Sequence, residues 1–122
     1  MKVSRRNVLA GAAAVPLAGL ASWRWSYHGG AVLVHDPMLA AGREFAAVTL
    51  VDGRQSLALE GDRIRFAREL FASRPLLVRG VTRQADAVLL EDVAGEEGYS
   101  RVALEVRGNA IDWALAPRIV WA

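Results

Sequence analysis

Residues 101–116 read RVALEVRGNAIDWALA and carry the clearest structural pattern in the sequence. Apolar and polar residues alternate on both sides of Gly108-Asn109, a dipeptide that suits a two-residue turn. The pattern predicts an antiparallel hairpin of residues 101–107 and 110–116 at the edge of a sheet. One face of this hairpin would carry three apolar pairs, namely Val102 with Leu115, Leu104 with Trp113, and Val106 with Ile111.

The same register places Glu105 opposite Asp112, and like charges in that position repel each other. Arg107 or Arg101 on the same face would relieve the repulsion diagonally. A bound cation is therefore not needed to explain the pair.

Upstream of the hairpin, short apolar runs alternate with amphipathic ones, a rhythm typical of βαβ units around a parallel sheet. Strands are expected at residues 31–34, 56–59 and 76–78. Helices are expected from Pro37 to Gly53 with Asp36 as N-cap, over residues 63–73, and from a turn at residues 80–82 to a terminator at Gly98. We therefore predict one small two- or three-layer α/β domain over residues 31–122, with about three parallel strands, flanking helices and the C-terminal hairpin.

Helical spacing also predicts which side chains face inward. They are Met38, Ala41, Phe45 and Val48 in the first helix; Ile64, Phe66, Ala67, Leu70 and Phe71 in the second; and Ala85, Val88, Leu89 and Val93 in the third. Residues 38–59 also admit a second interpretation, a hairpin of residues 48–51 and 56–59 around Asp52-Gly53. We prefer the helix because Asp36-Pro37 gives it a clear start.

The composition limits the functions that the chain can have. Without Lys2, Arg5 and Arg6, 12 basic residues face 13 acidic ones, so there is no unbalanced basic surface and no nucleic-acid partner is expected. The chain has no cysteine, which excludes disulfides, thiolate metal sites and a thiol nucleophile. The patterns GxxxxGK[ST] and GxGxxG are absent, so we expect no cofactor.

The first 21 residues have the layout of an export signal. Lys2, Arg5 and Arg6 precede an apolar run from Val8 to Leu20, and the small residues of Gly19-Leu20-Ala21 suit cleavage before Ser22. The stretch from Ser4 to Leu9, SRRNVL, resembles the twin-arginine signal, with Arg5, Arg6 and Leu9 on the motif positions and Val8 where Phe is common. The resemblance implies the twin-arginine export machinery as a partner, the periplasm as destination, and cargo that is folded before export and often travels with a second protein.

Two aromatic segments border the domain. Trp23, Trp25 and Tyr27 lie in the expected linker, residues 22–30, which we expect to be a disordered N-terminus of the mature chain that ends at Gly29-Gly30. The alternative is an interfacial collar that holds the protein at the membrane if the signal stays attached. The tail Ile119–Trp121 is expected to pack back onto the sheet; a docking segment is the alternative.

Polar residues cluster where ligands bind in open α/β sheets, beyond the carboxyl ends of the strands. The predicted ligand-binding residues are Arg63, Gly80, Thr82, Arg83 and Asp86, with Gly80 and Thr82 opening a helix N-terminus that attracts anions. The candidate catalytic residues are His35, Asp36 and Asp62, with His35 as a general base. For a single histidine at a strand end we prefer a hydrogen-bonded structural role. A hard-metal site of His35 with Asp36, Glu60 and Asp62 lacks a recognised ligand spacing, so no metal is predicted.

No pattern of residues in the sequence is specific enough to identify a catalytic site. We therefore expect a small exported binding or accessory module that is not an enzyme. One alternative is a small enzyme for an anionic or phosphorylated substrate, in which His35 and Asp62 supply acid–base chemistry and residues 80–83 hold the anion. A second alternative is a membrane-tethered structural or interaction protein.

Overall fold

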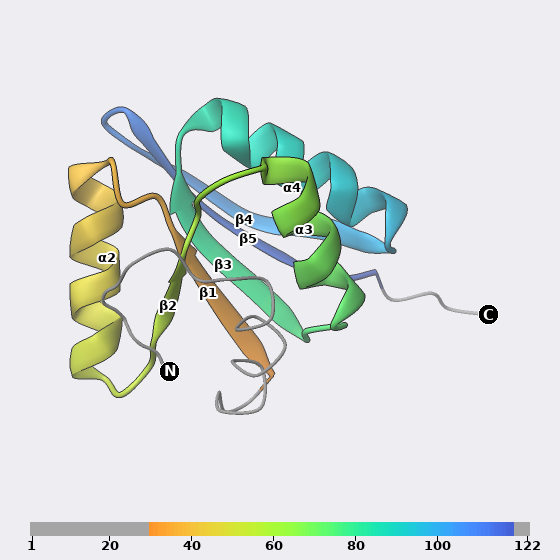
Figure 1. Cartoon of the computed structure of the whole chain (residues 1–122), viewed down its shortest axis with the longest axis horizontal. Helices are drawn as coiled ribbons and strands as arrows, with labels where there is room; N and C mark the ends of the chain where they lie inside the picture. The colour runs from red at the N-terminus through yellow and green to blue at the C-terminus, as the bar shows by residue number, and fades with distance from the viewer. Residues whose placement is uncertain (1–29, 119–122) are drawn as a thin grey trace.

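The computed structural model describes residues 30–118, which form a five-stranded mixed sheet with three helices (Figure 1). The elements are β1 (Ala31–His35), α2 (Ala40–Val51), β2 (Ser56–Ala58), α3 (Arg63–Ala72), β3 (Leu77–Thr82), α4 (Gln84–Glu96), β4 (Tyr99–Arg107) and β5 (Ala110–Pro117). The expected signal segment, the linker up to residue 29 and the tail Ile119–Trp121 lie outside the described residues.

The sheet has the strand order β2-β1-β3-β5-β4. Strand β1 pairs in parallel with β2 and β3, while β5 pairs antiparallel with β3 and β4. The predicted mixed α/β architecture and the C-terminal hairpin are confirmed. The expectation of about three parallel strands is matched in part, by these two parallel pairs.

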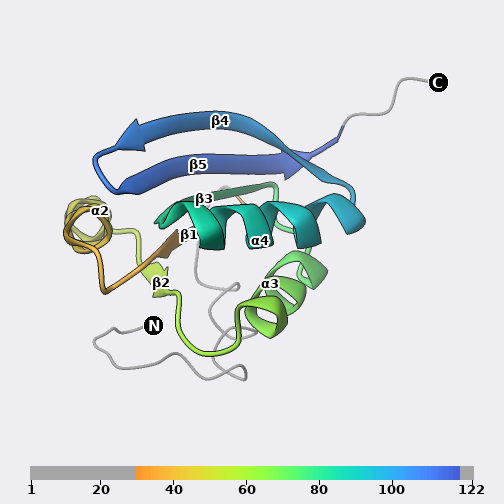
Figure 2. The ribbon, with the colours of Figure 1, turned by 90° about the horizontal axis from the view of Figure 1, so that it is seen from above.

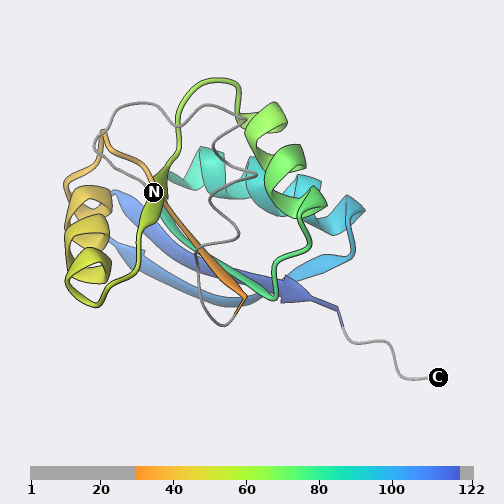
Figure 3. The same ribbon diagram turned by 60° about the horizontal axis from the view of Figure 1, so that its bottom comes forward.

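The helices cover both faces of the sheet, α2 on one and α3 with α4 on the other (Figures 2 and 3). Alternation along β1 explains this division, because Val32 and Val34 contact the α3–α4 cluster while Leu33 contacts the α2 cluster. None of the helices between residues 30 and 118 has the length and apolar character of a membrane span.

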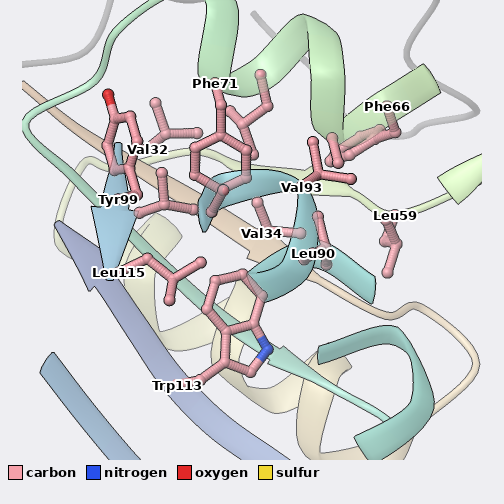
Figure 4. Packing of buried hydrophobic residues seen from close by; sticks show 14 of the residues in the cluster. Val32, Val34, Leu59, Phe66, Phe71, Leu90, Val93, Tyr99, Trp113 and Leu115 are labelled. Atoms are coloured by element: carbon pink, nitrogen blue, oxygen red, sulfur yellow. The ribbon is translucent and has the colours of Figure 1, made fainter. Parts of the chain in front are cut away.

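The larger cluster is built around aromatic side chains (Figure 4). The rings of Phe71 on α3 and Tyr99 on β4 lie with their centroids 5.0 Å apart, and Trp113 of β5 closes the cluster from the sheet. The Tyr99 hydroxyl donates to the Pro75 carbonyl at 2.6 Å, so its polar end is satisfied inside the core. Fully burying a large apolar side chain contributes about 1.5–3 kcal/mol, so each large buried side chain of this cluster stabilises the fold.

The turn expected at residues 80–82 is wrong, because β3 continues to Thr82. Gly80 pairs with Trp113 across the antiparallel ladder, and a Cβ at position 80 would overlap the indole ring. Glycine is needed here to make room for that ring and not to bend the chain. The indole Nε1 donates to Thr82 Oγ1 at 2.9 Å, which fixes the end of the strand.

The start predicted for the first helix is also wrong. Helix α2 begins at Ala40, with Leu39 at the N-cap position, and Asp36 forms a turn in which its Oδ1 accepts from the Met38 amide at 2.9 Å. The alternative hairpin around Asp52-Gly53 is contradicted as well, because residues 40–51 are helical.

The inward faces are confirmed for α3 and only in part for α2 and α4. Phe45 and Val93 are buried as expected, but the residues predicted inward and found exposed are Met38, Val48, Ala85, Val88 and Leu89. Leu90 and Ala94 are buried in their place on α4. Apolar residues occur on several sides of this helix, so packing against α3 and the sheet decides which side is covered. The terminator at Gly98 is confirmed by its φ of +87°.

The hairpin keeps the predicted register near its turn, with Leu104 opposite Trp113 and Glu105 opposite Asp112. A register shift between Arg101 and Ala103 makes Val102 an extra residue, so Arg101 lies opposite Leu115 and the predicted Val102 pair is wrong.

The predicted relief of charge repulsion by Arg107 is confirmed, since its Nη2 lies 3.2 Å from Asp112 Oδ2. Arg79 of β3 adds a second contact that the sequence analysis missed, with its Nε and Nη2 at 3.2 and 2.8 Å from the Asp112 oxygens.

We expect Gly80→Ala to lower the free energy of unfolding by about 1–3 kcal/mol, because the new methyl group would overpack against Trp113. The matched control is Gly95→Ala in α4, where a Cβ meets no atom within 4 Å and helix propensity favours alanine by up to about 1 kcal/mol. Urea unfolding of both variants measures the difference. Equal effects of the two substitutions would contradict the assigned contact.

Candidate ligand-binding site

The carboxyl ends of β1, β2 and β3 meet at one edge of the sheet, where the strand order reverses. From β1 the chain passes through α2 to β2 on one side, and from β2 through α3 to β3 on the other. The two connecting helices cover opposite faces, so the end of β1 is a topological switch point, the usual ligand position in such sheets. Backbone hydrogen bonds hold this end in place, from Asp36 N to Val81 O at 3.0 Å and from Leu59 N to His35 O at 2.8 Å.

Asp36 occupies the switch point itself. Its side chain is 1% exposed, and its Oδ1 is held by the Met38 amide. Its Oδ2 has no hydrogen-bond donor, although Arg83 Nε lies 3.5 Å away. A buried carboxylate oxygen costs free energy unless a donor or a cation reaches it, and here the partly exposed Arg83 guanidinium provides an ion pair.

Gly42 of α2 fixes the backbone of Asp36. A Cβ at position 42 would collide with the Asp36 carbonyl oxygen, which also accepts from Leu39 N at 3.2 Å. The close approach of the helix therefore holds the aspartate at the strand end.

Glu60 follows β2 at the same edge of the sheet, and one of its carboxylate oxygens also lacks a hydrogen-bond donor. Its Oε1 is buried and accepts no hydrogen bond, and among residues 30–118 it shares this condition only with Asp36 Oδ2. Within the described part of the chain, no group of three or more His, Asp or Glu residues is arranged to hold a metal ion.

The predicted anion-binding arginines have carboxylate partners. Arg63 Nε lies 3.3 Å from Asp86 Oδ1, which ties the start of α3 to the start of α4, and its Nη1 donates to the Gly61 carbonyl at 2.9 Å. Arg83 lies at the N-cap position of α4 and faces Asp36. Neither ion pair was predicted from the sequence, because the partners are distant in the chain.

His35 and Thr82 do not come together as the enzyme hypothesis requires. His35 pairs with Val81, whose side chain lies in the α2 cluster, whereas Thr82 contacts Trp113 in the α3–α4 cluster. The sheet therefore separates the two side chains. Thr82 is fully buried, and its hydroxyl donates to the Arg83 carbonyl while accepting from the indole, so it does not open a helix N-terminus as predicted.

His35 and Asp62, the candidate acid–base groups, both form hydrogen bonds that serve the fold. The His35 Nδ1 lies 2.8 Å from Ser56 Oγ, and burial lowers the pKa of the imidazole to about 4 against a smaller opposing effect of Asp36. Asp62 caps α3, since its Oδ1 accepts from the amides of Ile64 and Arg65 at 2.9 and 3.1 Å. At neutral pH the histidine is uncharged and hydrogen-bonded beneath α2.

No protein-family model matches the sequence, and no curated protein is similar to it.

The lowered pKa of His35 predicts a pH-dependent stability. The unfolded chain takes up a proton near pH 6.5 and the folded chain only near pH 4, so the His35 contribution is full above pH 6.5 and falls as the pH drops towards 4. The total loss is on the order of 3 kcal/mol. We expect His35→Gln to remove this part of the slope when free energies of unfolding are measured from pH 4.5 to 8.

Ser56→Ala provides the comparison, because it removes the hydrogen bond and leaves the imidazole in place. That variant should keep most of the slope. An unchanged slope in His35→Gln would show that other groups cause the acid sensitivity.

Proposed function

We propose that the chain is a small exported binding or accessory module whose ligand binds at the carboxyl ends of β1, β2 and β3. The observation that carries the proposal is the buried Asp36 Oδ2, which lacks a hydrogen-bond donor at the topological switch point. Glu60 Oε1 at the neighbouring strand end supports the same location. Neither oxygen accepts a hydrogen bond among residues 30–118, and Asp36 Oδ2 has only the ion pair with Arg83.

A binding role fits this edge better than catalysis. His35 is bonded to Ser56, Asp62 caps α3, and the Thr82 hydroxyl is bonded on both sides, so these three candidate groups already serve the fold. The enzyme alternative needs His35 and Thr82 near one reacting centre, and their positions on opposite faces speak against it.

The export part of the proposal rests on residues 1–21, with the twin-arginine machinery as the partner and the periplasm as destination. A co-exported protein is a further expected partner, and membrane contact is expected only if the signal stays attached. The balanced charge of the remaining chain agrees with a signal that only delivers the domain.

The export proposal predicts that Arg5→Lys with Arg6→Lys leaves the precursor in the cytoplasm of a host that has the machinery. The control is Arg24→Lys, which makes the same chemical change outside the motif. Fractionation and immunoblotting measure the distribution. Equal periplasmic amounts of both variants would contradict a twin-arginine signal.

The binding proposal predicts that some members of a panel of cationic, anionic and neutral small molecules stabilise the full chain and shift backbone amide signals at residues 36, 60 and 83. A ligand at roughly 100 times its Kd should add about 2.7 kcal/mol to the free energy of unfolding. Glu60→Gln should weaken the effect, whereas Glu44→Gln on the exposed side of α2 should not. A panel that never shifts these amides would contradict a ligand site at this edge.

A further inference from the structure

Strand β4 forms one edge of the sheet, and among residues 30–118 it pairs with β5 alone (Figure 2). It is nine residues long, and every residue from Arg101 to Arg107 is exposed. An edge strand presents a row of unpaired backbone groups, and native proteins usually cover or blunt such edges. The outer side of β4 is therefore a surface on which another strand can pair.

Three apolar side chains occupy every second position of this edge. Val102, Leu104 and Val106 are 59, 48 and 65% exposed, and together they are called the apolar strip below. Leu104 lies opposite Trp113, which belongs to the α3–α4 cluster. Val106 lies opposite Ile111 of the same cluster, so the strip faces that side of the sheet. A row of exposed apolar side chains on an unpaired strand indicates an interaction surface.

The backbone of β4 is oriented for further pairing at the strip. Arg107 and Ala110 lie opposite each other and close the two-residue turn, and residues in this position are hydrogen-bonded to each other. Ladder bonds alternate along an antiparallel pair, so the backbone groups of Glu105 point to β5 and those of Leu104 and Val106 point away from it. Leu104 and Val106 can therefore bond to a strand on the outer side.

We propose that this strand is the interface of a dimer, in which β4 pairs antiparallel with β4 of a second copy about a two-fold axis at Leu104. Leu104 then lies opposite Leu104 of the second copy, and on both sides of it Val102 of one copy lies opposite Val106 of the other. The strip is its own complement, as a two-fold interface requires, because Val102 and Val106 are equally far from Leu104. Apolar cross-strand pairs of this kind stabilise a sheet.

The other residues of β4 favour this register over its neighbours. On the opposite face, Glu105 lies opposite Ala103 of the second copy, so no two carboxylates are paired. A pairing centred on Glu105 would place two carboxylates opposite each other, and like charges in that position are destabilising. A pairing centred on Val106 would place Leu104 opposite the turn residue Gly108, which offers no apolar side chain.

The β-bulge described above prevents a clash of like charges at the ends of the interface. Regular alternation would place Arg101 and Arg107 of the second copy opposite each other on one face. The register shift instead places Arg101 opposite Leu115 of the α3–α4 cluster, with its Nη1 3.4 Å from Glu91 Oε1. Arg107 lies on the other face, where its Nη2 is 3.2 Å from Asp112 Oδ2. Each guanidinium therefore has a carboxylate partner in its own chain.

The test is sedimentation equilibrium of the full chain over a range of concentrations, in which we expect a reversible dimer. Leu104→Lys places two ammonium groups opposite each other and should raise the dissociation constant at least about tenfold. Leu50→Lys on α2, where the leucine is 64% exposed, is the matched control and should not change it. A wild-type chain that stays monomeric, or association of equal strength in Leu104→Lys, would overturn the proposal.

Single cysteines test the register, because the chain has no cysteine of its own. Leu104→Cys places two thiols opposite each other with Cα atoms about 5.5 Å apart, which suits a disulfide. Val106→Cys places them roughly 14 Å apart along the strands, which is too far. Mild oxidation should therefore crosslink only Leu104→Cys on a non-reducing gel. Crosslinking of Val106→Cys to the same or a greater extent would overturn the pairing.

The chain's own tail, residues 119–122, is the competing occupant of the strip. In a mixture of differently isotope-labelled copies of the full chain, the Leu104 methyl groups should show nuclear Overhauser effects between copies. A monomer in which these methyl groups instead show effects to the indole of Trp121 would overturn the dimer and assign the strip to the tail. Strands β3 and β5 separate β4 from β1, and none of these measurements uses a ligand, so the result does not depend on the proposed binding site.

Discussion

The contact between the Trp113 indole and Gly80 is the constraint on which the rest of the structure depends. The ring occupies the space that a side chain at position 80 would fill, and its Nε1 binds the hydroxyl of Thr82. Together these contacts attach the C-terminal hairpin to β3 and extend that strand to Thr82. Because β3 ends there, Arg83 is positioned beside Asp36. The core therefore determines the geometry of the candidate site.

The candidate site differs from the core in how its polar groups are satisfied. In the core, the polar atoms of Tyr99, Thr82 and Trp113 all have hydrogen-bond partners. At the switch point, Asp36 Oδ2 and Glu60 Oε1 accept no hydrogen bond, and Asp36 Oδ2 has only an ion pair with the partly exposed Arg83. Buried acceptors without donors are rare in native structures, and they occur here where sheets of this kind bind ligands. This coincidence of position and missing donors is the observation that supports the proposed binding function.

Much of the fold could be predicted from local patterns. Strict alternation around Gly108-Asn109 predicted the hairpin, and the alternation of apolar runs with amphipathic ones predicted the order of strands and helices before it. The failures occurred where one local pattern suits two structures. An aspartate before a proline serves as a helix cap or as a turn, and the turn was found at Asp36.

Other features depend on residues far apart in the chain and have no local signal. From the local sequence, Gly80 was interpreted as a turn residue. Its actual role is to make room for the ring of Trp113, which is 33 positions away and leaves no local signal. His35 and Thr82 lie on opposite faces of the sheet. This placement depends on the register between β1 and β3, which the pattern of a single strand does not specify. The edge of the sheet was predictable from the order of strands and helices, whereas the ion pair of Arg83 with Asp36 required the tertiary structure.

The most direct test of this account is a measurement of nuclear Overhauser effects between the Gly80 α-protons and the six-membered ring of Trp113. We predict strong effects, together with an upfield ring-current shift of at least one Gly80 α-proton, because the indole lies against that glycine. Gly80 α-proton shifts typical of an unstructured chain, without effects to the indole, would contradict the contact and the placement of Arg83 that depends on it.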